Sequence, residues 1–309
     1  MLNRPLDILT QYPIRKSKIQ KQAFRDAVQV YLEGFDYPVS VENGMLGSRN
    51  LVIGDPDQAK YLVTAHYDTC ANMLLPNLIT PCNVTLYLLY QIGIVFLMII
   101  GSVAAGVFSG FLLGNGSVKW ISLTVYWILL FSLILGPANK ANANDNTSGV
   151  VTLLEIARTL PENQRHKVCF VLFDLEEAGL IGSTSYRKKH KKASDNQIVL
   201  NLDCVGDGDH LMMFPTKPML KNRKKLTSLY RACGYFGKKS LLVHEKGAAV
   251  YPSDQKHFPY GVGICALRKR KNILYMSRIH TKKDTVLEET NVNILRAALT
   301  TFICCDEVN

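Results

Sequence analysis

Residues 168–183, VCFVLFDLEEAGLIGS, decide the fold of this chain. The run 168–173 is apolar at every position, so the strand that it predicts must be covered on both faces, as in the centre of a helix-covered sheet. Polar and acidic residues follow at once, beginning with Asp174. Open α/β sheets collect their ligands at the carboxyl ends of the strands, so this stretch predicts the position of a site as well as a fold.

Comparable apolar runs occur along the rest of the chain, and helical patterns separate them. The sequence predicts strands at 50–54, 61–65, 198–202 and 261–267, and helices at 17–35, 146–160 and 291–304. The helix at 146–160 is expected to begin with Thr147 or Ser148 near its N-cap. The alternation predicts an α/β fold with an open, mostly parallel or mixed sheet that carries helices on both faces.

Two long apolar stretches lie between these elements. Residues 84–113 contain no charged side chain, and residues 118–135 contain only Lys119. A membrane-spanning helix needs ~20 apolar residues, and the connector 114–117 is rich in turn formers. We therefore expect residues 81–137 to form a two-pass transmembrane hairpin that contacts the lipid bilayer through 84–113 and 118–136. A buried core hairpin or a dimerisation arm is the alternative.

A two-pass hairpin returns the chain to the side that it left, so residues 1–80 and 138–309 are expected to form one domain. The first 25 residues contain six basic side chains and no apolar segment, which does not resemble a signal peptide. This favours a multi-pass membrane protein whose folded domain is cytoplasmic. The eight cysteines have no C-x-x-C spacing, which indicates reduced thiols and not a zinc ribbon.

Composition narrows the possible partners. The 309 residues include 36 Lys and Arg against 25 Asp and Glu, a net charge of +11, and 48% of the residues are hydrophobic, which excludes a disordered or collagenous chain. Basic runs at 187–192, 217–225 and 268–271 suit solvated surfaces or a face that attracts anionic lipid. No nucleic-acid-binding motif accompanies them, so we expect no nucleic acid partner.

Metal-capable side chains follow one predicted strand after another. They are His66 and Asp68, Asp145, Asp174 with Glu176 and Glu177, Asp203, and His280 with Asp284. Two histidines with several carboxylates suit zinc, or less specifically manganese or cobalt. Two cations at ~3.5–4 Å need one bridging carboxylate, and each needs a terminal histidine and a terminal carboxylate. A further carboxylate can then act as the general base.

The segments AHYDT, NDNTSG, FDLEEAGLIGSTSY, NLDCVG, SDQKHF and IHTKKDT resemble, in the same order, those of the M28 peptidases, which are co-catalytic di-zinc aminopeptidases and their relatives. The resemblance implies an M28 phosphorylase/hydrolase-like sandwich that binds two zinc ions. The implied metal ligands are His66, Asp145, Glu177, Asp203 and His280. Asp145 would be the bridge, Asp68 would orient the His66 imidazole, and Glu176 would be the general base. Asp284 resembles an outer partner near His280.

The implied function is a membrane-anchored di-zinc aminopeptidase that hydrolyses peptides with a free N-terminus through a metal-activated water. The alternatives are another enzyme on this scaffold, such as a carboxypeptidase or a glutaminyl cyclase that usually works with one zinc, or a non-catalytic receptor. Two features depart from the family pattern. The hairpin separates His66 from Asp145, which predicts a catalytic mouth near the membrane surface, and Gln255 replaces a histidine beside Ser253 and Asp254. Oligomeric state and substrate preference are left open.

Overall fold

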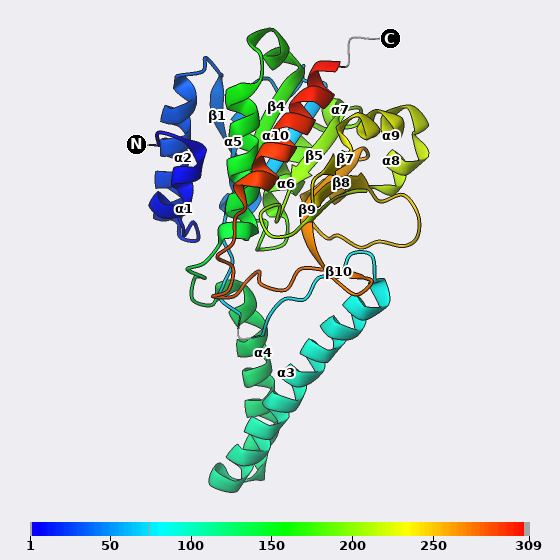
Figure 1. Ribbon diagram of the computed structural model, residues 1–309. Helices are drawn as coiled ribbons and strands as arrows, with labels where there is room; N and C mark the ends of the chain where they lie inside the picture. The colour runs from blue at the N-terminus through cyan, green and yellow to red at the C-terminus, as the bar shows by residue number, and fades with distance from the viewer. Residues whose placement is uncertain (1, 74, 306–309) are drawn as a thin grey trace.

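The computed structural model describes residues 2–73 and 75–305, and these form one domain with a projecting hairpin (Figure 1). Its ten-stranded sheet has the order β1-β2-β4-β3-β5-β9-β6-β8-β7, with β10 paired to β9. The strands are β1 Val39–Asn43, β2 Arg49–Ile53, β3 Tyr61–His66, β4 Val168–Phe173, β5 Ile198–Leu202, β6 His210–Pro215, β7 Gly234–Phe236, β8 Lys239–Val243, β9 Gly261–Arg270 and β10 Ile273–Tyr275.

The sheet is mixed, with a parallel centre and margins that are antiparallel except where β6 pairs in parallel with β8. β4, β3, β5 and β9 pair in parallel, whereas β1 with β2, β2 with β4, β6 with β9 and β7 with β8 pair antiparallel. All four strands predicted beside β4 are present. The short strands at the far margin were not predicted, because their sequences lack the continuous apolar run of a strand that is buried on both faces.

Helices cover both faces of the sheet, as the run 168–173 predicts. The helices of the domain are α1 Ile8–Gln11, α2 Lys18–Glu33, α5 Gly149–Thr159, α6 Ile181–Lys189, α7 Lys191–Ser194, α8 Lys217–Lys221, α9 Arg223–Leu229 and α10 Glu289–Cys304. Val168, Phe170 and Leu172 of β4 join the core formed with α5 and α10. The alternate β4 residues, Cys169, Val171 and Phe173, pack with Tyr186 of α6 on the other face.

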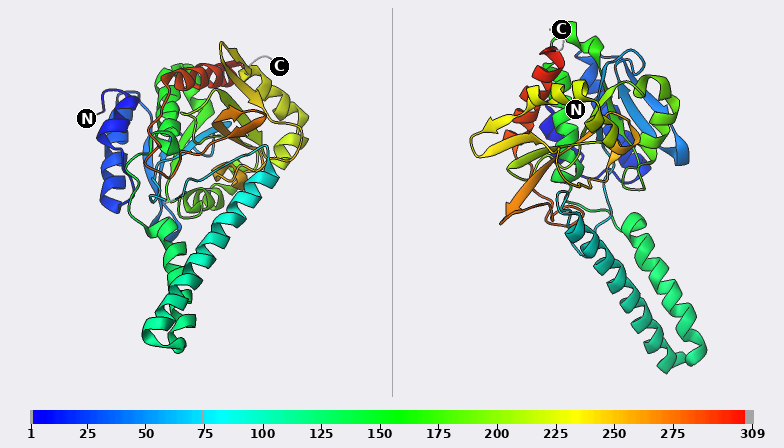
Figure 2. Two further views of the ribbon diagram at one scale, coloured as in Figure 1. Left: turned by 60° about the horizontal axis from the view of Figure 1, so that its bottom comes forward. Right: turned by 90° about the vertical axis from the view of Figure 1, so that its right-hand side faces the viewer.

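The hairpin consists of α3 Val84–Leu113 and α4 Val118–Leu135, which extend well beyond the domain (Figure 2). Both helices are long and apolar enough to cross a membrane, and little of α3 and none of the apolar stretch of α4 is buried. The hairpin is therefore not a core element of the domain, and the alternative of a buried core hairpin is excluded.

The two helices touch near the connector and diverge toward the domain (Figure 1). A Cβ at Gly106 would lie 1.9 Å from Ser122 Oγ, and one at Gly110 would lie 2.7 Å from Val118 Cγ2. Small residues at this four-residue spacing allow close helix approach, so the contact near the connector depends on them.

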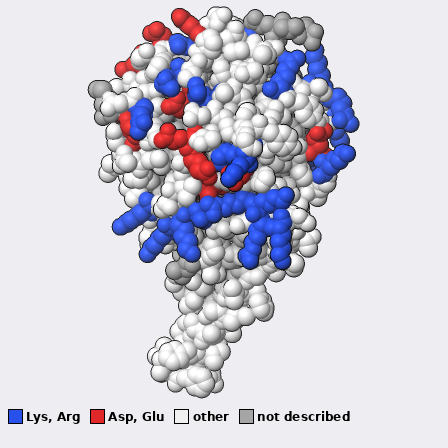
Figure 3. Space-filling model, in the orientation of Figure 1, with Lys and Arg blue, Asp and Glu red and all other residues white. Residues whose placement is uncertain are grey.

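Lys and Arg side chains form a band where the hairpin leaves the domain (Figure 3). The exposed cations of β9 and its turn, Lys269, Arg270 and Lys271, and those of the loop after β10, Lys282 and Lys283, belong to elements at this level (Figure 1). Lys16 adds a link to the hairpin, because its Nζ donates 2.6 Å to the carbonyl oxygen of Ile134 in α4. Basic charge that is dispersed in the sequence is thus gathered at the base of the apolar helices.

Candidate metal centre

The first half of the site lies at the carboxyl ends of two neighbouring parallel strands. His66 ends β3, and Asp203 follows β5. The Nε2 atom of His66 lies 3.2 Å from Asp145 Oδ1 and 3.6 Å from Asp203 Oδ1. The three side chains are buried, and their nearest ligand atoms lie within 4.8 Å of one another, so they can hold one metal ion.

The second half shares Asp145 with the first. Its Oδ2 atom lies 2.9 Å from His280 Nε2, which also lies 3.4 Å from Glu177 Oε2. The two oxygens of one carboxylate therefore face two different histidines. That is the geometry expected of a carboxylate that bridges two cations.

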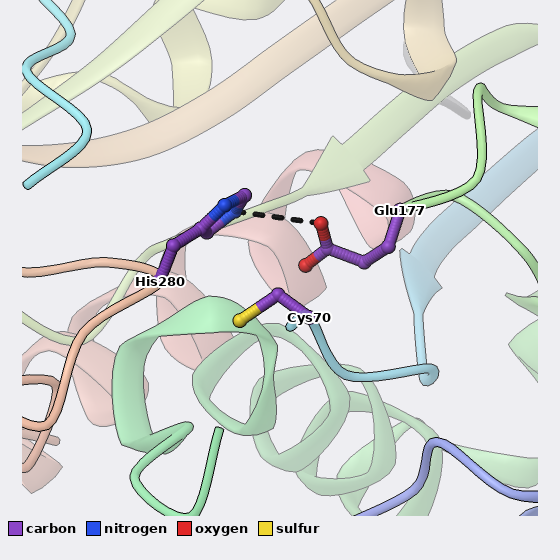
Figure 4. Close-up of side chains that lie close together, drawn as sticks. All are labelled: Cys70, Glu177 and His280. Carbon is purple, nitrogen blue, oxygen red and sulfur yellow. Dashed lines mark ion pairs between the residues drawn. The ribbon is translucent and has the colours of Figure 1, made fainter. Parts of the chain in front are cut away.

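Cys70 lies beside the second half, although sequence reasoning did not select it. Figure 4 shows its side chain next to Glu177 and His280, and one potential ligand atom of each lies within 4.8 Å of the others. The thiol is buried and donates 3.6 Å to Asn142 Oδ1. Cys70 belongs to no C-x-x-C pair that would mark it as a metal ligand. In the sequence, only its position four residues after His66 places it near the site.

Two buried carboxylates hold the backbone that carries the acidic side chains. Asp68 accepts hydrogen bonds from the backbone N–H groups of Glu176, at 3.0 Å, and Glu177, at 3.2 Å. Its carboxylate also lies 3.6 Å from His66 Nδ1, which is closer, at 3.1 Å, to the Asp68 carbonyl oxygen. Asp284 accepts hydrogen bonds from the N–H groups of Asn144, at 2.8 Å, and Asp145, at 3.0 Å.

The segment NDNTSG, residues 144–149, leads into α5, and its Asn146 and Gly149 each meet a structural requirement. The peptide bond between Asp145 and Asn146 is cis. The Asn146 amide donates 2.9 Å to the carbonyl oxygen of Leu202 at the end of β5, and its oxygen accepts from the N–H of Gly149. A Cβ at Gly149 would lie 2.3 Å from the Leu202 carbonyl oxygen, so only glycine allows this approach. The helix predicted at 146–160 therefore starts at Gly149.

Three residues next to the site adopt left-handed backbone conformations that disfavour side chains. Leu175 precedes Glu176 with φ 56°, Cys204 follows Asp203 with φ 55°, and His280 itself has φ 61°. Such conformations cost ~1–3 kcal/mol each and persist only where the surrounding structure imposes them. Here they lie in the turns that carry Glu176, Asp203 and His280.

Arg15 is a buried cation close to the site, and sequence reasoning did not identify it. Its guanidinium donates to the carbonyl oxygens of Tyr67, at 2.5 Å, and Tyr12, at 2.7 Å, and to Thr147 Oγ1 at 3.1 Å. Burial lowers the pKa of Arg15 to about 10, although Asp68 and Asp145 oppose this shift. Its bonds join the loops after β3 and before α5.

The acids and histidines of the site perturb one another strongly. Burial alone would lower the pKa of His66, but Glu176 and the neighbouring aspartates raise it well above its usual value. For His280, burial is likewise opposed by Glu177 and Asp145, which raise the pKa to about 9. Burial, with the nearby acids, raises the pKa of Glu177 to about 8 and that of Glu176 well above its usual value.

This donor set fits divalent cations. Four carboxylates, those of Asp145, Glu176, Glu177 and Asp203, converge with two histidines, and in their ionised forms these carboxylates carry a negative charge that burial makes costly. Among the described residues, no donor reaches the buried Oε1 atom of Glu177. Nitrogen and oxygen donors of this kind suit zinc.

Comparison with known proteins identifies the family. The sequence model of peptidase family M28 matches residues 127–302, which is more than half of the chain. The chain belongs to peptidase family M28. The match includes Asp145, Glu176, Glu177, Asp203 and His280 but begins within α4, after the β3 motif with His66 and Asp68.

Similarities to individual known proteins are partial or distant. Aminopeptidase YwaD of Bacillus subtilis is 40% identical over 67 residues, which is 21% of this chain and only 15% of that protein. The glutaminyl cyclase of Porphyromonas gingivalis has a TM-score of 0.58 at 16% identity, covering 95% of this chain and 93% of the cyclase. A Zn-dependent exopeptidase from Parabacteroides distasonis has a TM-score of 0.57 at 16% identity, covering 94% and 92% of the two chains.

The SDQKHF segment of this M28 chain is hydrogen-bonded to β5, the strand that precedes Asp203. The Asn201 amide in β5 donates to Ser253 Oγ, at 2.9 Å, and to Gln255 Oε1, at 3.1 Å. The Gln255 amide donates 2.8 Å to the Tyr251 carbonyl oxygen. Gln255 therefore belongs to a buried network that joins this loop to a central strand.

The hairpin forms part of the wall of the candidate metal centre. A cavity of about 120 Å³ contains the acidic side chains and both histidines, and its other lining residues are Asn77, Ile79, Tyr87, Cys204, Tyr251, Pro252 and Ile279. Tyr87 lies in the first turn of α3. The apolar hairpin therefore begins at the site itself.

Proposed function

We propose that this M28 chain is a membrane-anchored di-zinc aminopeptidase. The observation that carries the proposal is the position of Asp145, whose two carboxylate oxygens face His66 and His280 separately, at 3.2 and 2.9 Å. Asp203 and Glu177 supply one further oxygen ligand on each side. The partial similarity to an aminopeptidase and the fold shared with a Zn-dependent exopeptidase support the same reaction and metal.

Two bound zinc ions would polarise the scissile carbonyl and acidify the attacking water. His66, Asp145 and Asp203 would hold one ion, and Asp145, Glu177 and His280 the other. Glu176 would accept the proton of the water and return it to the leaving amine. The hydrogen bonds from the Glu176 and Glu177 N–H groups to Asp68 position both carboxylates for these different tasks.

The test is metal analysis of detergent-purified protein together with hydrolysis of aminoacyl chromogenic substrates. Wild type should contain two zinc ions per chain and hydrolyse substrates with a free α-amine but not N-blocked ones. Asp145→Ala should lose both metal and activity, because both ions share this ligand. A fully metallated and active Asp145→Ala variant would overturn the proposal.

We further propose that α3 and α4 anchor residues 1–80 and 138–309 as one cytoplasmic domain against a membrane. The exposed apolar surface of the hairpin and the basic band at its base support this arrangement, because Lys and Arg favour the cytoplasmic face. The protein should stay in the pellet after alkaline extraction of membranes and require detergent for release. Recovery in the aqueous supernatant would contradict the anchor.

A glutaminyl cyclase is the second candidate, because the fold of one such enzyme covers nearly the whole of both chains. Peptides with N-terminal glutamine separate the two reactions. A cyclase would release ammonia and leave the peptide chain intact, whereas an aminopeptidase would release free glutamine. The complete second half of the site, with Glu177 and His280, favours hydrolysis with two metals.

A further inference from the structure

A second cavity lies between the two hairpin helices at their domain end. It has a volume of about 130 Å³ and is lined by Met73, Pro76, Asn77, Tyr90, Gln91, Ile94, Val95, Met98, Tyr126, Leu130 and Leu133. Most of these side chains are apolar. The polar ones cluster near the domain, where the Gln91 amide donates 3.4 Å to Asn77 Oδ1.

The cavity is adjacent to the cavity of the metal centre, and the loop before α3 lies between them. Asn77 lines both cavities. Met73 lines the second cavity, and its sulfur lies 3.3 Å from His280 Nδ1. The Met73 N–H also donates 2.8 Å to the His280 carbonyl oxygen. An occupant of the hairpin cavity would therefore reach the side chains that contact the site.

The hairpin geometry restricts what can enter. Gly106 and Gly110 bring the helices together near the connector, so the space between them widens toward the domain. A transmembrane α-helix with its side chains is about 10–12 Å across, which is too wide for a cavity of this volume. A single extended hydrocarbon chain is narrow enough, and apolar walls suit it.

We infer that the cavity between α3 and α4, here called the hairpin groove, binds a hydrocarbon chain of the substrate while the hydrolysed amide lies at the metal centre. This inference rests on the proposed function. The substrate class is an aminoacyl or peptidyl amide whose leaving amine carries one alkyl chain. Hydrolysis adds water across the C–N bond, releasing a carboxylate and an alkylammonium ion, and needs no other reactant.

The test measures kcat/KM for aminoacyl n-alkylamides of increasing chain length, with the protein in lipid nanodiscs. The value should rise up to about fourfold for each methylene that moves from water into the groove, and should then level off when the groove is full. Ile94→Trp, which fills the groove, should remove this dependence. Leu97→Trp is the matched control, because Leu97 lies on the same helix, does not line the groove and is 56% exposed.

Partition of the substrate into lipid would give the same chain-length dependence in all three proteins without levelling off, and that result would overturn the inference. A second measurement does not need hydrolysis. A long-chain alkylamine with a photoreactive group in its chain should label Met98 and Leu130 in wild type, and labelling spread evenly over the outer surface of the hairpin would also overturn the inference. Absence of hydrolysis with labelling confined to the groove would refute the aminopeptidase alone.

Discussion

At the level of single residues, the site depends on carboxylates that hold other carboxylates in place. Asp68 accepts hydrogen bonds from two consecutive backbone N–H groups, those of Glu176 and Glu177. Asp284 does the same with the N–H groups of Asn144 and Asp145. Each arrangement orients acidic side chains through the backbone. The candidate ligands Glu177 and Asp145 are therefore each held by a second carboxylate, Asp68 or Asp284, which fixes the backbone that carries them.

Replacement of Glu176 separates proton transfer from metal binding. Glu176→Gln keeps the size of the side chain but cannot accept the proton of the water, so kcat should fall about 10²–10⁴-fold. Zinc content should remain that of wild type, because none of the five proposed ligands changes. Glu162→Gln, at an exposed position, is the control for the loss of one glutamate. Normal turnover by a metallated Glu176→Gln variant would refute the role of Glu176.

Cys70 allows a spectroscopic test of the ligands at the second metal position. The five proposed ligands donate only nitrogen and oxygen, so cobalt-loaded wild type should show no thiolate-to-cobalt charge-transfer band in the near ultraviolet. Cys70→Ser should therefore leave the spectrum unchanged, as should the control Cys305→Ser, at an exposed cysteine. A charge-transfer band in wild type that is lost in Cys70→Ser would show that the sulfur is a further ligand and that the proposed set is incomplete.

At the level of elements, the hairpin helices combine two kinds of contact. Near the connector, Gly106 and Gly110 allow backbone approach, whereas at the domain end the helices separate around the hairpin groove. The base is tied to the site loops, because the Asn72 N–H donates 2.8 Å to the Pro137 carbonyl oxygen and Ile79 pairs with Met276. The hairpin is thus an extension of the loops that carry the candidate metal centre.

Substitution of the hairpin glycines tests this close packing. Gly106→Leu places a side chain where even a Cβ would overlap Ser122, so it should destabilise the hairpin by about 1–3 kcal/mol. Gly101→Leu is the matched control, since a Cβ there meets nothing within 4 Å. Thermal unfolding of detergent-solubilised protein measures both. Equal unfolding temperatures for the two variants would contradict the packing.

At the level of the whole molecule, folding determines where charge and apolar surface meet. The lysines and arginines near the ends of α3 and α4 in the sequence are too few to predict an orientation. In the folded protein, basic residues from β9, from the loop after β10 and from the N-terminal segment lie at the base of the hairpin. Charge gathered there complements anionic lipid headgroups.

The metal-free protein should lose stability as pH rises from 6 to 9. The pKa of His280 is raised to about 9, so its stabilising contribution is complete below its unfolded value of about 6.5 and is lost as pH rises through 9. The raised pKa of Glu177, about 8, acts in the same direction, because the folded state binds more protons than the unfolded chain.

Zinc replaces these protons, so the metal-loaded protein should not show this loss. Thermal unfolding of chelator-treated and zinc-loaded protein at pH 6 and pH 9 makes the comparison. A metal-free protein that is more stable at pH 9 than at pH 6 would show that the acids and histidines of the site do not interact as described.

Local patterns in the sequence determined the central strands, the helices that cover them and the apolar hairpin. Residues 168–173 are apolar on both faces because alternate side chains enter two different cores, and that requirement is visible in six consecutive letters. The same holds for α3 and α4, whose length and lack of charge need no tertiary contact to be recognised. The edge strands lacked such a pattern and were missed.

Only the tertiary structure decided how the candidate site residues meet. His66 and His280 are more than 200 positions apart, and their approach to opposite oxygens of Asp145 depends on strand order and on left-handed turns that no local pattern encodes. Arg15, Cys70 and the hairpin groove became visible for the same reason. Contacts between distant segments are set by packing, which is a property of the folded chain and not of any single stretch of it.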